Sequence, residues 1–295
     1  MRIINPSIEL LEQTDLISHV ARCARICYRK ETGNDKALYD SLIKRNHLSM
    51  FRHATRYYIV PKQCVPKWVD DYMNAVTFNA KIVGIDIDYS LGIYYIVVNG
   101  QWRLEHPGLI SLIDKYIVDA KEFANANETS WNMMRYTFKV ITQISTSREL
   151  NRVSPNNIAE QSTRYVYEDG TICRPYWMTD EDYEIFKDEH SDDTFIPEYY
   201  LNNNYKIKVR KYVWSCDRSF FDYKDLIKFG MDRQDARGVL PLDTATVCAY
   251  TYSANEWRNI IDLRYYGITG KPHPNAAIIA GMIRKELMEL GYEFR

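Results

Sequence analysis

Residues 148–165 read Arg-Glu-Leu-Asn-Arg-Val-Ser-Pro-Asn-Asn-Ile-Ala-Glu-Gln-Ser-Thr-Arg-Tyr, and no other stretch says more about the fold and the function. Arginines lie on both sides of a Pro-Asn-Asn break, and a carboxylate and a hydroxyl lie between them. Arginine binds phosphate oxygens through two parallel N–H groups, so these residue types suit a nucleotide monophosphate. On a helix, Arg148 and Arg152 share one face. The residues alone leave an alternative open, in which Glu149 and Glu160 neutralise the arginines within the protein.

The length and the charge of the chain limit the classes of protein to which it belongs. Its 295 residues, 46% of them hydrophobic, suffice for a substantial core. The 38 basic and 39 acidic residues give a formal net charge of −1. Proteins that bind extended nucleic acid usually carry a basic excess, so we expect no such partner. A local basic pocket for a small anion is compatible with this balance.

Cysteine spacing and the N-terminal residues favour an intracellular protein without a metal site. The six cysteines include no Cys-x-x-Cys pair, and Cys23 and Cys27 have no further metal ligands nearby. We therefore expect reduced thiols and no bound metal. The first residues lack an apolar signal segment, and no apolar run approaches the length of a membrane span. We expect a cytoplasmic protein without a membrane partner.

Residue patterns along the chain predict an α+β fold. Runs of β-prone residues predict strands, and apolar residues at helical spacing predict helices. The predicted strands are 3–4, 55–60, 82–88, 93–98 and 136–141, and 244–252 fits either a strand or a helix. The predicted helices are 14–28, 35–45, 67–76, 107–126, 145–153, 205–229, 255–263 and 275–290, with a loop at 47–53 and a sharp turn at 99–100. No repeat or flexible linker divides the chain, so we expect one elaborated domain over 1–295, with an inserted α/β segment at about 61–134.

Three further places carry residue types that functional sites use. Arg264 follows an apolar helix and precedes two tyrosines, so it is suited to stack on a planar base or, alternatively, to reach solvent. His47 and His53 lie six residues apart, where cofactor contacts and ordinary loop roles are both open. His273 precedes Pro274 at the start of a predicted helix, whose N-terminus suits a phosphate, but a capping or surface role is more common for such a residue. The sequence contains no dinucleotide-binding glycine motif, P-loop or serine nucleophile elbow.

Taken together, these segments resemble the flavin-dependent thymidylate synthase family. The family signature is Arg-His-Arg-x-x-Ser-x-Asn-Glu-x-Ser-x-Arg-Tyr, and Glu160 to Tyr165 match its second half in full. The first half keeps only Arg152. The likeness continues in the family's order through residues 23–28, 47–53, 94–103, 237–241 and 256–274, and so covers most of the chain.

The resemblance implies a fold, a reaction and an assembly. The fold would be a mixed, largely antiparallel sheet flanked by helices, like that of the thymidylate synthase complementing proteins. The enzyme would methylate dUMP to dTMP, with methylenetetrahydrofolate as carbon donor and with FAD, reduced by NADPH, as hydride donor. No enzyme nucleophile would attack the pyrimidine. The partners would be these small molecules, and active sites would lie between the subunits of a homotetramer.

The resemblance also assigns roles to residues of this sequence. Arg264 would be the catalytic residue, lying against the uracil and activating its C5 atom. The dUMP-binding set would be Glu149, Arg152, Glu160, Gln161, Ser162, Thr163, Arg164, Arg237 and Arg264. The FAD-binding set would be His47, Ser49, Arg152, Glu160, Asn259 and His273. No metal is implied.

Four positions depart from the family pattern. Val153 and Ser154 replace the His-Arg pair that follows the first arginine. Ser253 and Asn255 replace an asparagine and an arginine of the C-terminal helix. Each lost charge-assisted contact costs about 1.5–3 kcal/mol, so several together would weaken FAD binding by orders of magnitude. Arg52, at a position where the family has glutamate, would return one positive charge.

These departures leave three interpretations of the sequence. The favoured one is a divergent flavin-dependent thymidylate synthase. The second is a related pyrimidine-nucleotide hydroxymethylase, whose reaction needs no final hydride. The third is a non-catalytic nucleotide-binding paralogue that has lost FAD.

Overall fold

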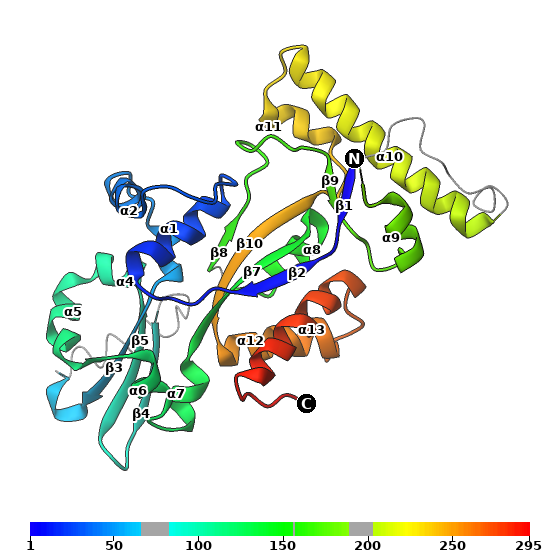
Figure 1. Cartoon of the computed structure of the whole chain (residues 1–295). Coiled ribbons are helices and arrows are strands. Elements are labelled where there is room, and N and C mark those ends of the chain that lie inside the picture. Colours follow the sequence, from blue (N-terminus) through cyan, green and yellow to red (C-terminus); the bar gives the residue numbers. More distant parts are fainter. Residues whose placement is uncertain (66–82, 156, 189–202) are drawn as a thin grey trace.

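The central sheet of the fold joins strands that lie far apart in the sequence. The computed structural model describes residues 1–65, 83–155, 157–188 and 203–295. In the sheet, β2 (Ser7–Leu10) pairs with β7 (Arg135–Gln143), β7 with β10 (Ala245–Ser253), and β10 with β8 (Ile158–Glu160). All of these pairs are antiparallel. The sheet therefore brings the signature segment after β8 next to the C-terminal part of the chain (Figure 1).

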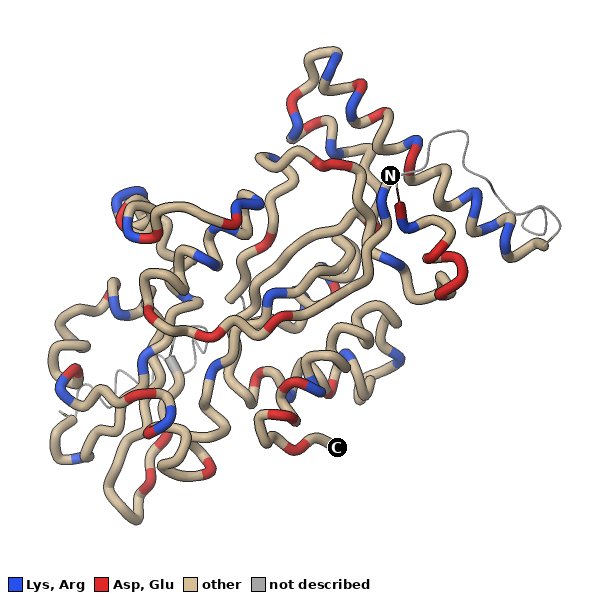
Figure 2. The backbone as a smooth tube through the Cα atoms, in the orientation of Figure 1, with Lys and Arg blue, Asp and Glu red and all other residues tan. Residues whose placement is uncertain are grey.

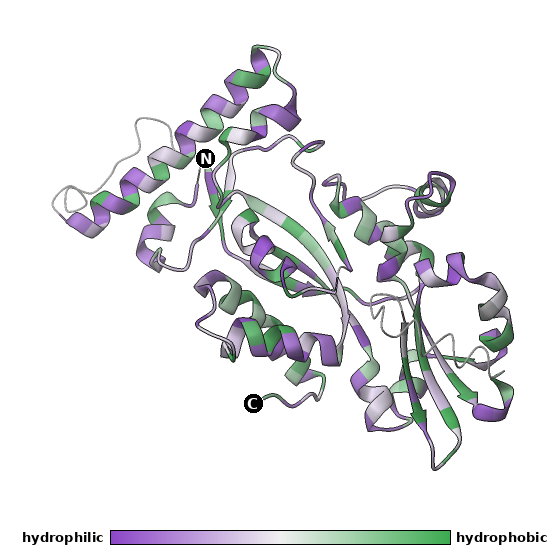
Figure 3. Ribbon diagram, turned by 180° about the vertical axis from the view of Figure 1, so that it is seen from behind, coloured by the Kyte–Doolittle hydropathy of each residue, from purple (hydrophilic) through white to green (hydrophobic). Residues whose placement is uncertain are grey.

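Helices cover both faces of this sheet. Because side chains alternate along a strand, Tyr250 of β10 faces one core and its neighbour Ala249 faces the other. The first core is completed by α12 (Ala254–Ile261) and α13 (Pro274–Glu289), and the second by α1 (Leu16–Ile26). Figure 3 shows apolar residues along the strands and along α13, where these layers meet.

A second antiparallel sheet is formed by residues that lie between β2 and β7 in the sequence. Its order is β4 (Val83–Asp88), β5 (Ile93–Asn99), β3 (Thr55–Pro61) and β6 (Ile117–Val118). Short helical segments surround it: α4 (Gly100–Glu105), α5 (Pro107–Ile113), η3 (Asp114–Tyr116), α6 (Ala120–Ala124) and α7 (Glu128–Met133). This sheet has its own buried residues on each face, including Tyr58 with Trp102 and Tyr57 with Phe123.

A third group of elements precedes the η5 segment in the chain. The short strands β1 (Arg2–Ile4) and β9 (Thr171–Cys173) are parallel neighbours. They pack with α9 (Asp180–Phe186) and the long helix α10 (Asn204–Lys228). From α10 the chain passes through α11 (Arg233–Ala236) and η5 (Arg237–Val239) into β10. The remaining elements are α2 (Asp35–Lys44), η1 (Leu48–His53), η2 (Lys62–Cys64), α8 (Ile144–Asn151) and the π-helical turn η6 (Asp262–Tyr266).

Several helix ends follow the signals in the sequence. Asp15 caps α1, since its side chain accepts a hydrogen bond from the backbone N–H of Ser18. Pro274 occupies the first turn of α13, where its missing N–H costs nothing. Gly291 follows α13 with φ of 100°, a left-handed conformation that favours glycine.

The predicted α+β fold with a largely antiparallel sheet is confirmed. Residues 244–252, which fitted either state, form a strand because β10 has a pairing partner on each side. The prediction of one domain with an insertion at about 61–134 stays a prediction. The predicted helix 67–76 lies outside the described residues.

Three local predictions were wrong. The predicted helix 107–126 is broken, because Ile117 and Val118 pair with β3 and Asp119 then caps the separate helix α6. No sharp turn lies at 99–100, because the Asn99 side chain accepts from the N–H of Trp102 and starts α4. Residues 48–53 form a 3-10 helix instead of an irregular loop.

The placement of charged and apolar residues in the structure does not change the classes of protein that the sequence allows. Basic and acidic residues are interspersed along most elements (Figure 2). No described helix is both long and apolar enough to span a membrane.

Candidate functional site

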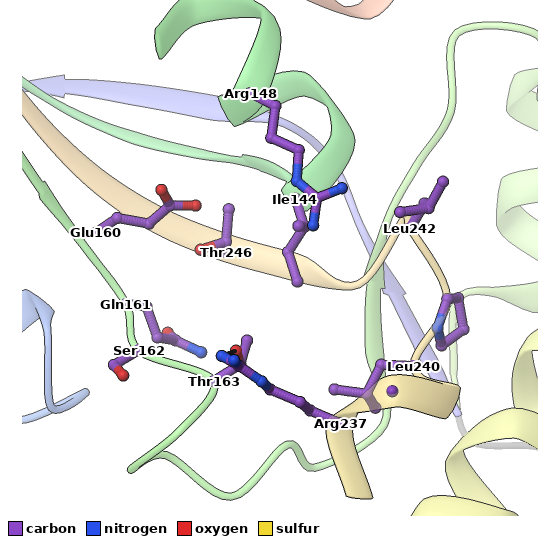
Figure 4. Close-up of a pocket in the computed structure, with 12 residues that line it drawn as sticks. Ile144, Arg148, Glu160, Gln161, Ser162, Thr163, Arg237, Leu240, Leu242 and Thr246 are labelled. Atoms are coloured by element: carbon purple, nitrogen blue, oxygen red, sulfur yellow. Dashed lines mark hydrogen bonds between the residues drawn. The ribbon is translucent and has the colours of Figure 1, made fainter. Parts of the chain in front are cut away.

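A pocket of about 600 Å³ opens where α8, the segment after β8 and the η5 segment meet. Each of these elements contributes side chains, and β10 forms part of the wall (Figure 4). The lining residues are Ile144, Arg148, Glu160, Gln161, Ser162, Thr163, Arg237, Gly238, Leu240, Pro241, Leu242 and Thr246. The structure therefore brings Glu160, Gln161, Ser162, Thr163 and Arg237 of the expected nucleotide set into one cavity.

The backbone of the signature segment is held at both sides. The N–H of Gln161 donates to the carbonyl oxygen of Val247 in β10, at 2.8 Å. The N–H of Ser162 donates to the carbonyl oxygen of Cys27, which follows α1, at 3.0 Å. The sheet and the end of α1 thus fix the place at which the Ser162 and Thr163 hydroxyls enter the pocket.

Two arginines give the pocket a positive character. Arg148 is exposed, and its guanidinium makes no hydrogen bond or ion pair within the described residues. The guanidinium of Arg237 donates to the Thr163 hydroxyl oxygen at 2.9 Å. Figure 4 shows the two side chains entering from different elements. An anion between them would gain charge-assisted hydrogen bonds that the protein does not supply.

Glu160 is the carboxylate in the lining, and it is held by neutral groups. The hydroxyl of Ser147 donates to its Oε1 atom at 2.7 Å, and the amide of Asn151 donates to Oε2 at 3.3 Å. Neither partner is an arginine, so Glu160 does not neutralise Arg148. The internal neutralisation that the sequence left open therefore does not apply to the pocket's own arginines.

Glu149 does neutralise two of the expected arginines, outside the pocket lining. The Arg264 side chain is 15% exposed, donates from Nε to the Glu149 carbonyl oxygen at 2.9 Å and lies 3.9 Å from its carboxylate. Arg152 is 72% exposed and lies 3.4 Å from the same carboxylate. Arg164 is exposed and donates to the Gln234 side chain at 3.3 Å. Within one chain, these three arginines are not brought into the pocket.

The expected FAD-binding residues come from separate elements. His47, Asn259 and His273 are exposed, and Ser49 is half-buried. None of these four lines the pocket. One chain therefore does not gather them around the nucleotide set.

The four positions that depart from the family pattern have structural contacts. Val153 packs against the core of Phe138 and its neighbours. Ser154 and Tyr252 are joined by a hydrogen bond between their hydroxyls. Ser253 caps α12 by accepting from the N–H of Glu256 at 3.2 Å. The fourth position, Asn255, accepts from the Arg258 guanidinium at 3.0 Å.

His53, at the end of the segment 47–53, belongs to a buried polar chain. Its Nδ1 atom lies 2.7 Å from the Thr251 hydroxyl, which lies 2.7 Å from that of Thr137. The Thr137 hydroxyl lies 3.1 Å from Nε2 of His19. Burial lowers the pKa of His53 to about 3 and that of His19 to about 4, so both rings are neutral near pH 7.

Sequence reasoning missed part of the pocket. Arg148 was recognised as a phosphate-binding type but received no role from the resemblance. In the apolar wall, Leu240 lies inside the likeness at 237–241, but Ile144 and Leu242 belong to no motif. Thr246 lies two positions before the buried Cys248 in β10, so the alternation of side chains along a strand was the one available signal for its orientation.

The described residues show no metal-binding cluster and, at three of the six cysteines, no reactive thiol. No group of three or more His, Cys, Asp or Glu side chains in them is arranged to bind a metal ion. Burial raises the pKa of the Cys23, Cys173 and Cys216 thiols to about 12, which makes them poor nucleophiles.

Comparison with known proteins shows the family to which the chain belongs. A family model described as thymidylate synthase complementing protein matches residues 113–289, more than half of the chain. The chain belongs to this family. The family comprises flavin-dependent thymidylate synthases, as the signature indicated. Every residue that lines the pocket lies inside the matched segment of this family member.

Solved structures give a more distant likeness. Two structures of the UMP/dUMP methylase PolB from Streptomyces cacaoi, with 5-Br dUMP and with 5-Br UMP, are 17% and 16% identical to the chain. Both have a TM-score of 0.45 and cover 98% of this chain, and 93% and 92% of their own chains are covered. No curated protein matches the chain in sequence.

Proposed function

We propose that the protein is a divergent flavin-dependent thymidylate synthase that methylates dUMP to dTMP, and that dUMP binds in the pocket between α8, β8 and η5. The observation that carries this proposal is the pair Arg148 and Arg237, which face one cavity inside the family segment. The cavity of about 600 Å³ is within the usual size of a small-molecule site. Its apolar wall suits the faces of a pyrimidine.

Different residues of the pocket would contact different parts of the nucleotide. Arg237 and Arg148 would bind the phosphate, and the Ser162 and Thr163 hydroxyls would complete its contacts. Glu160 is oriented by Ser147 and Asn151, so its carboxylate needs little reorganisation to meet the nucleotide. The family resemblance implies that Gln161 and Thr163 contact dUMP through their backbone groups, and both residues line the pocket.

Arg264 would polarise the uracil ring. A guanidinium against the carbonyl oxygen favours the anionic form of the base at N3 and so raises the electron density at C5. In one chain Arg264 is held by Glu149, away from the pocket. We therefore place the complete site between the subunits of a homotetramer in the cytoplasm, with Arg152, Arg164 and Arg264 meeting dUMP across an interface.

The chain's side chains fit an FAD that is held by fewer charged contacts than the family pattern provides. His47, Arg152, Asn259 and His273 are exposed and able to meet a ligand, and Ser49 is half-buried. The side chains at the four positions that depart from the family pattern pack in the core, cap a helix or form local hydrogen bonds. When bound and reduced by NADPH, FAD would supply the hydride that converts the methylene carbon delivered by methylenetetrahydrofolate into the methyl group of dTMP.

A direct assay tests the proposal. Purified protein is incubated with 5-tritiated dUMP, methylenetetrahydrofolate, FAD and NADPH, and tritium release from C5 is measured together with the mass of the product. We expect release of tritium and formation of dTMP, both dependent on FAD. Release of tritium without added or bound FAD, with a hydroxymethylated product, would replace this proposal by the hydroxymethylase. Binding of dUMP without any release would favour the non-catalytic paralogue.

The hydroxymethylase is kept as a second candidate for one structural reason. The four side chains at the positions that depart from the family pattern are uncharged and make contacts within the protein, so they would supply no charged contact to a flavin. Hydroxymethyl transfer needs no final hydride, so it tolerates that loss.

A further inference from the structure

The Gln161 side chain lies between two pockets. The residue lines the proposed nucleotide pocket and also a second pocket of about 430 Å³. The residue is 7% exposed, and its amide nitrogen lies 3.2 and 3.4 Å from the two carboxylate oxygens of Glu168. The amide oxygen has no hydrogen bond within the described residues, which leaves it to a ligand or to water.

Glu168 is a buried carboxyl with few partners. It is 3% exposed, and within the described residues the Gln161 amide is the group that donates to its oxygens. Its backbone N–H donates to the Tyr223 hydroxyl of α10 at 3.4 Å. One polar donor is a poor replacement for the water that a carboxylate loses on burial.

The charges near Glu168 oppose one another, so burial decides the pKa of its carboxyl group. Arg29 favours the charged form and Asp169 opposes it, but these two residues pair with each other at 2.6 Å. On the α10 and α11 side the facing groups are Tyr223 and Arg233. Burial dominates and raises the pKa of Glu168 to about 7, so both forms are present at neutral pH.

The two forms of the carboxyl select different ends of the Gln161 amide. An ionised carboxylate only accepts hydrogen bonds, so it binds the amide NH₂ group. A protonated carboxyl donates as well, and its O–H can bind the amide oxygen after the amide has turned over. The turned amide offers NH₂ donors to the pocket, and the nearby negative charge is gone. Both changes favour an anionic ligand.

We propose that Glu168 is a positioning residue for the nucleotide pocket, and that it takes up a proton from solvent as Gln161 turns its NH₂ group toward the nucleotide phosphate. This inference rests on the proposed function, because that function supplies the phosphate. Linkage is reciprocal, so phosphate binding promotes proton uptake to the extent that the proton promotes binding.

The test measures protons taken up when dUMP binds. Titration calorimetry of the full-length protein at pH 7, in two buffers with different ionisation enthalpies, gives the number for the wild type and for Glu168→Gln. The phosphate of dUMP itself titrates with a second pKa of about 6, equally in both proteins. We expect greater uptake in the wild type, and dUMP binding about tenfold tighter at pH 6 than at pH 8 beyond the change seen in Glu168→Gln, the ratio for a shift of one pKa unit.

Matched variants separate positioning from general charge effects. Asp169→Asn removes the carboxylate that opposes the charged form of Glu168 and leaves Gln161 in place, so it should move the proton uptake to lower pH without abolishing it. Gln161→Leu should lose the uptake, and adding Glu168→Gln to it should change nothing further. Gln161→Leu also serves as the test variant if Glu168→Gln does not fold. Deoxyuridine, which lacks the phosphate, should bind with equal uptake in all of these proteins.

One outcome would overturn the role of Glu168 alone, and another would also overturn the proposed function. Equal proton uptake in the wild type, Glu168→Gln and Gln161→Leu, with dUMP bound by all three, would overturn the role of Glu168 and leave the proposed function intact. Failure of the wild type to bind dUMP would overturn the proposed function and this inference together.

Discussion

Removal of Arg237 should weaken the binding of dUMP while leaving the fold intact. The guanidinium is exposed and donates to the Thr163 hydroxyl, a neutral group. Loss of one exposed hydrogen bond costs at most about 1 kcal/mol of folding stability. A charge-assisted contact with a phosphate contributes about 1.5–3 kcal/mol, so Arg237→Ala should raise the Kd of dUMP about 10- to 150-fold.

The assay compares two ligands in two variants. Titration calorimetry gives the Kd of dUMP and of deoxyuridine, and thermal unfolding gives the Tm of each protein. Arg233→Ala is the matched control, because Arg233 is an exposed arginine of α11 that donates to the Tyr165 carbonyl oxygen at 2.9 Å and does not line the pocket. Arg237→Ala should lose dUMP affinity and keep deoxyuridine affinity. An equal loss for both ligands, or the same loss in Arg233→Ala, would refute the phosphate role.

Three further predictions follow from other parts of the structure. Arg264→Ala should lower turnover about 10²- to 10³-fold with little change in Tm, and parallel losses of activity and Tm would show a structural role instead. Asn255→Arg, on the exposed side of α12, should tighten FAD binding at least about tenfold in a flavin fluorescence titration, and unchanged affinity would contradict the proposed flavin contact at that position. The pKa of buried His19 is lowered from 6.5 to about 4. Below pH 6.5 the unfolded chain therefore binds a proton that the folded protein excludes until about pH 4, and stability falls by about 3 kcal/mol as the pH falls through this range. In urea unfolding at pH 7 and pH 5, His19→Gln should lose less stability between the two values than the wild type, and an equal loss would count against this assignment.

The elements of the central sheet could be predicted where local pattern and tertiary pairing agree. Residues 136–141 read as a strand from their β-prone side chains, and the structure extends this strand to Arg135–Gln143 and pairs it on both sides. Residues 107–126 read as one helix, because periodicity does not reveal that Ile117 and Val118 pair with β3. Backbone hydrogen bonds to a distant strand outweigh a local preference of a few tenths of a kcal/mol per residue.

The candidate site could be predicted where its residues are contiguous in the sequence, but not where it depends on how distant elements pack. Glu160 to Thr163 are contiguous, so one strand and its exit place them together. Arg164 is the next residue but donates to Gln234, and that contact depends on where α11 packs. Arg148 and Arg152 are four apart, yet α8 ends at Asn151 and Arg152 turns to Glu149. Helical spacing therefore identified the pair without showing which arginine enters the pocket.

The product formed from dUMP tests the central claim most directly. The purified protein is incubated with dUMP, methylenetetrahydrofolate, FAD and NADPH, and the nucleotide products are identified by mass spectrometry. We predict dTMP in the wild type, with turnover strongly reduced in Arg237→Ala at low dUMP and retained in Arg233→Ala. A hydroxymethylated nucleotide, or unchanged dUMP in a protein that binds it, would contradict the account.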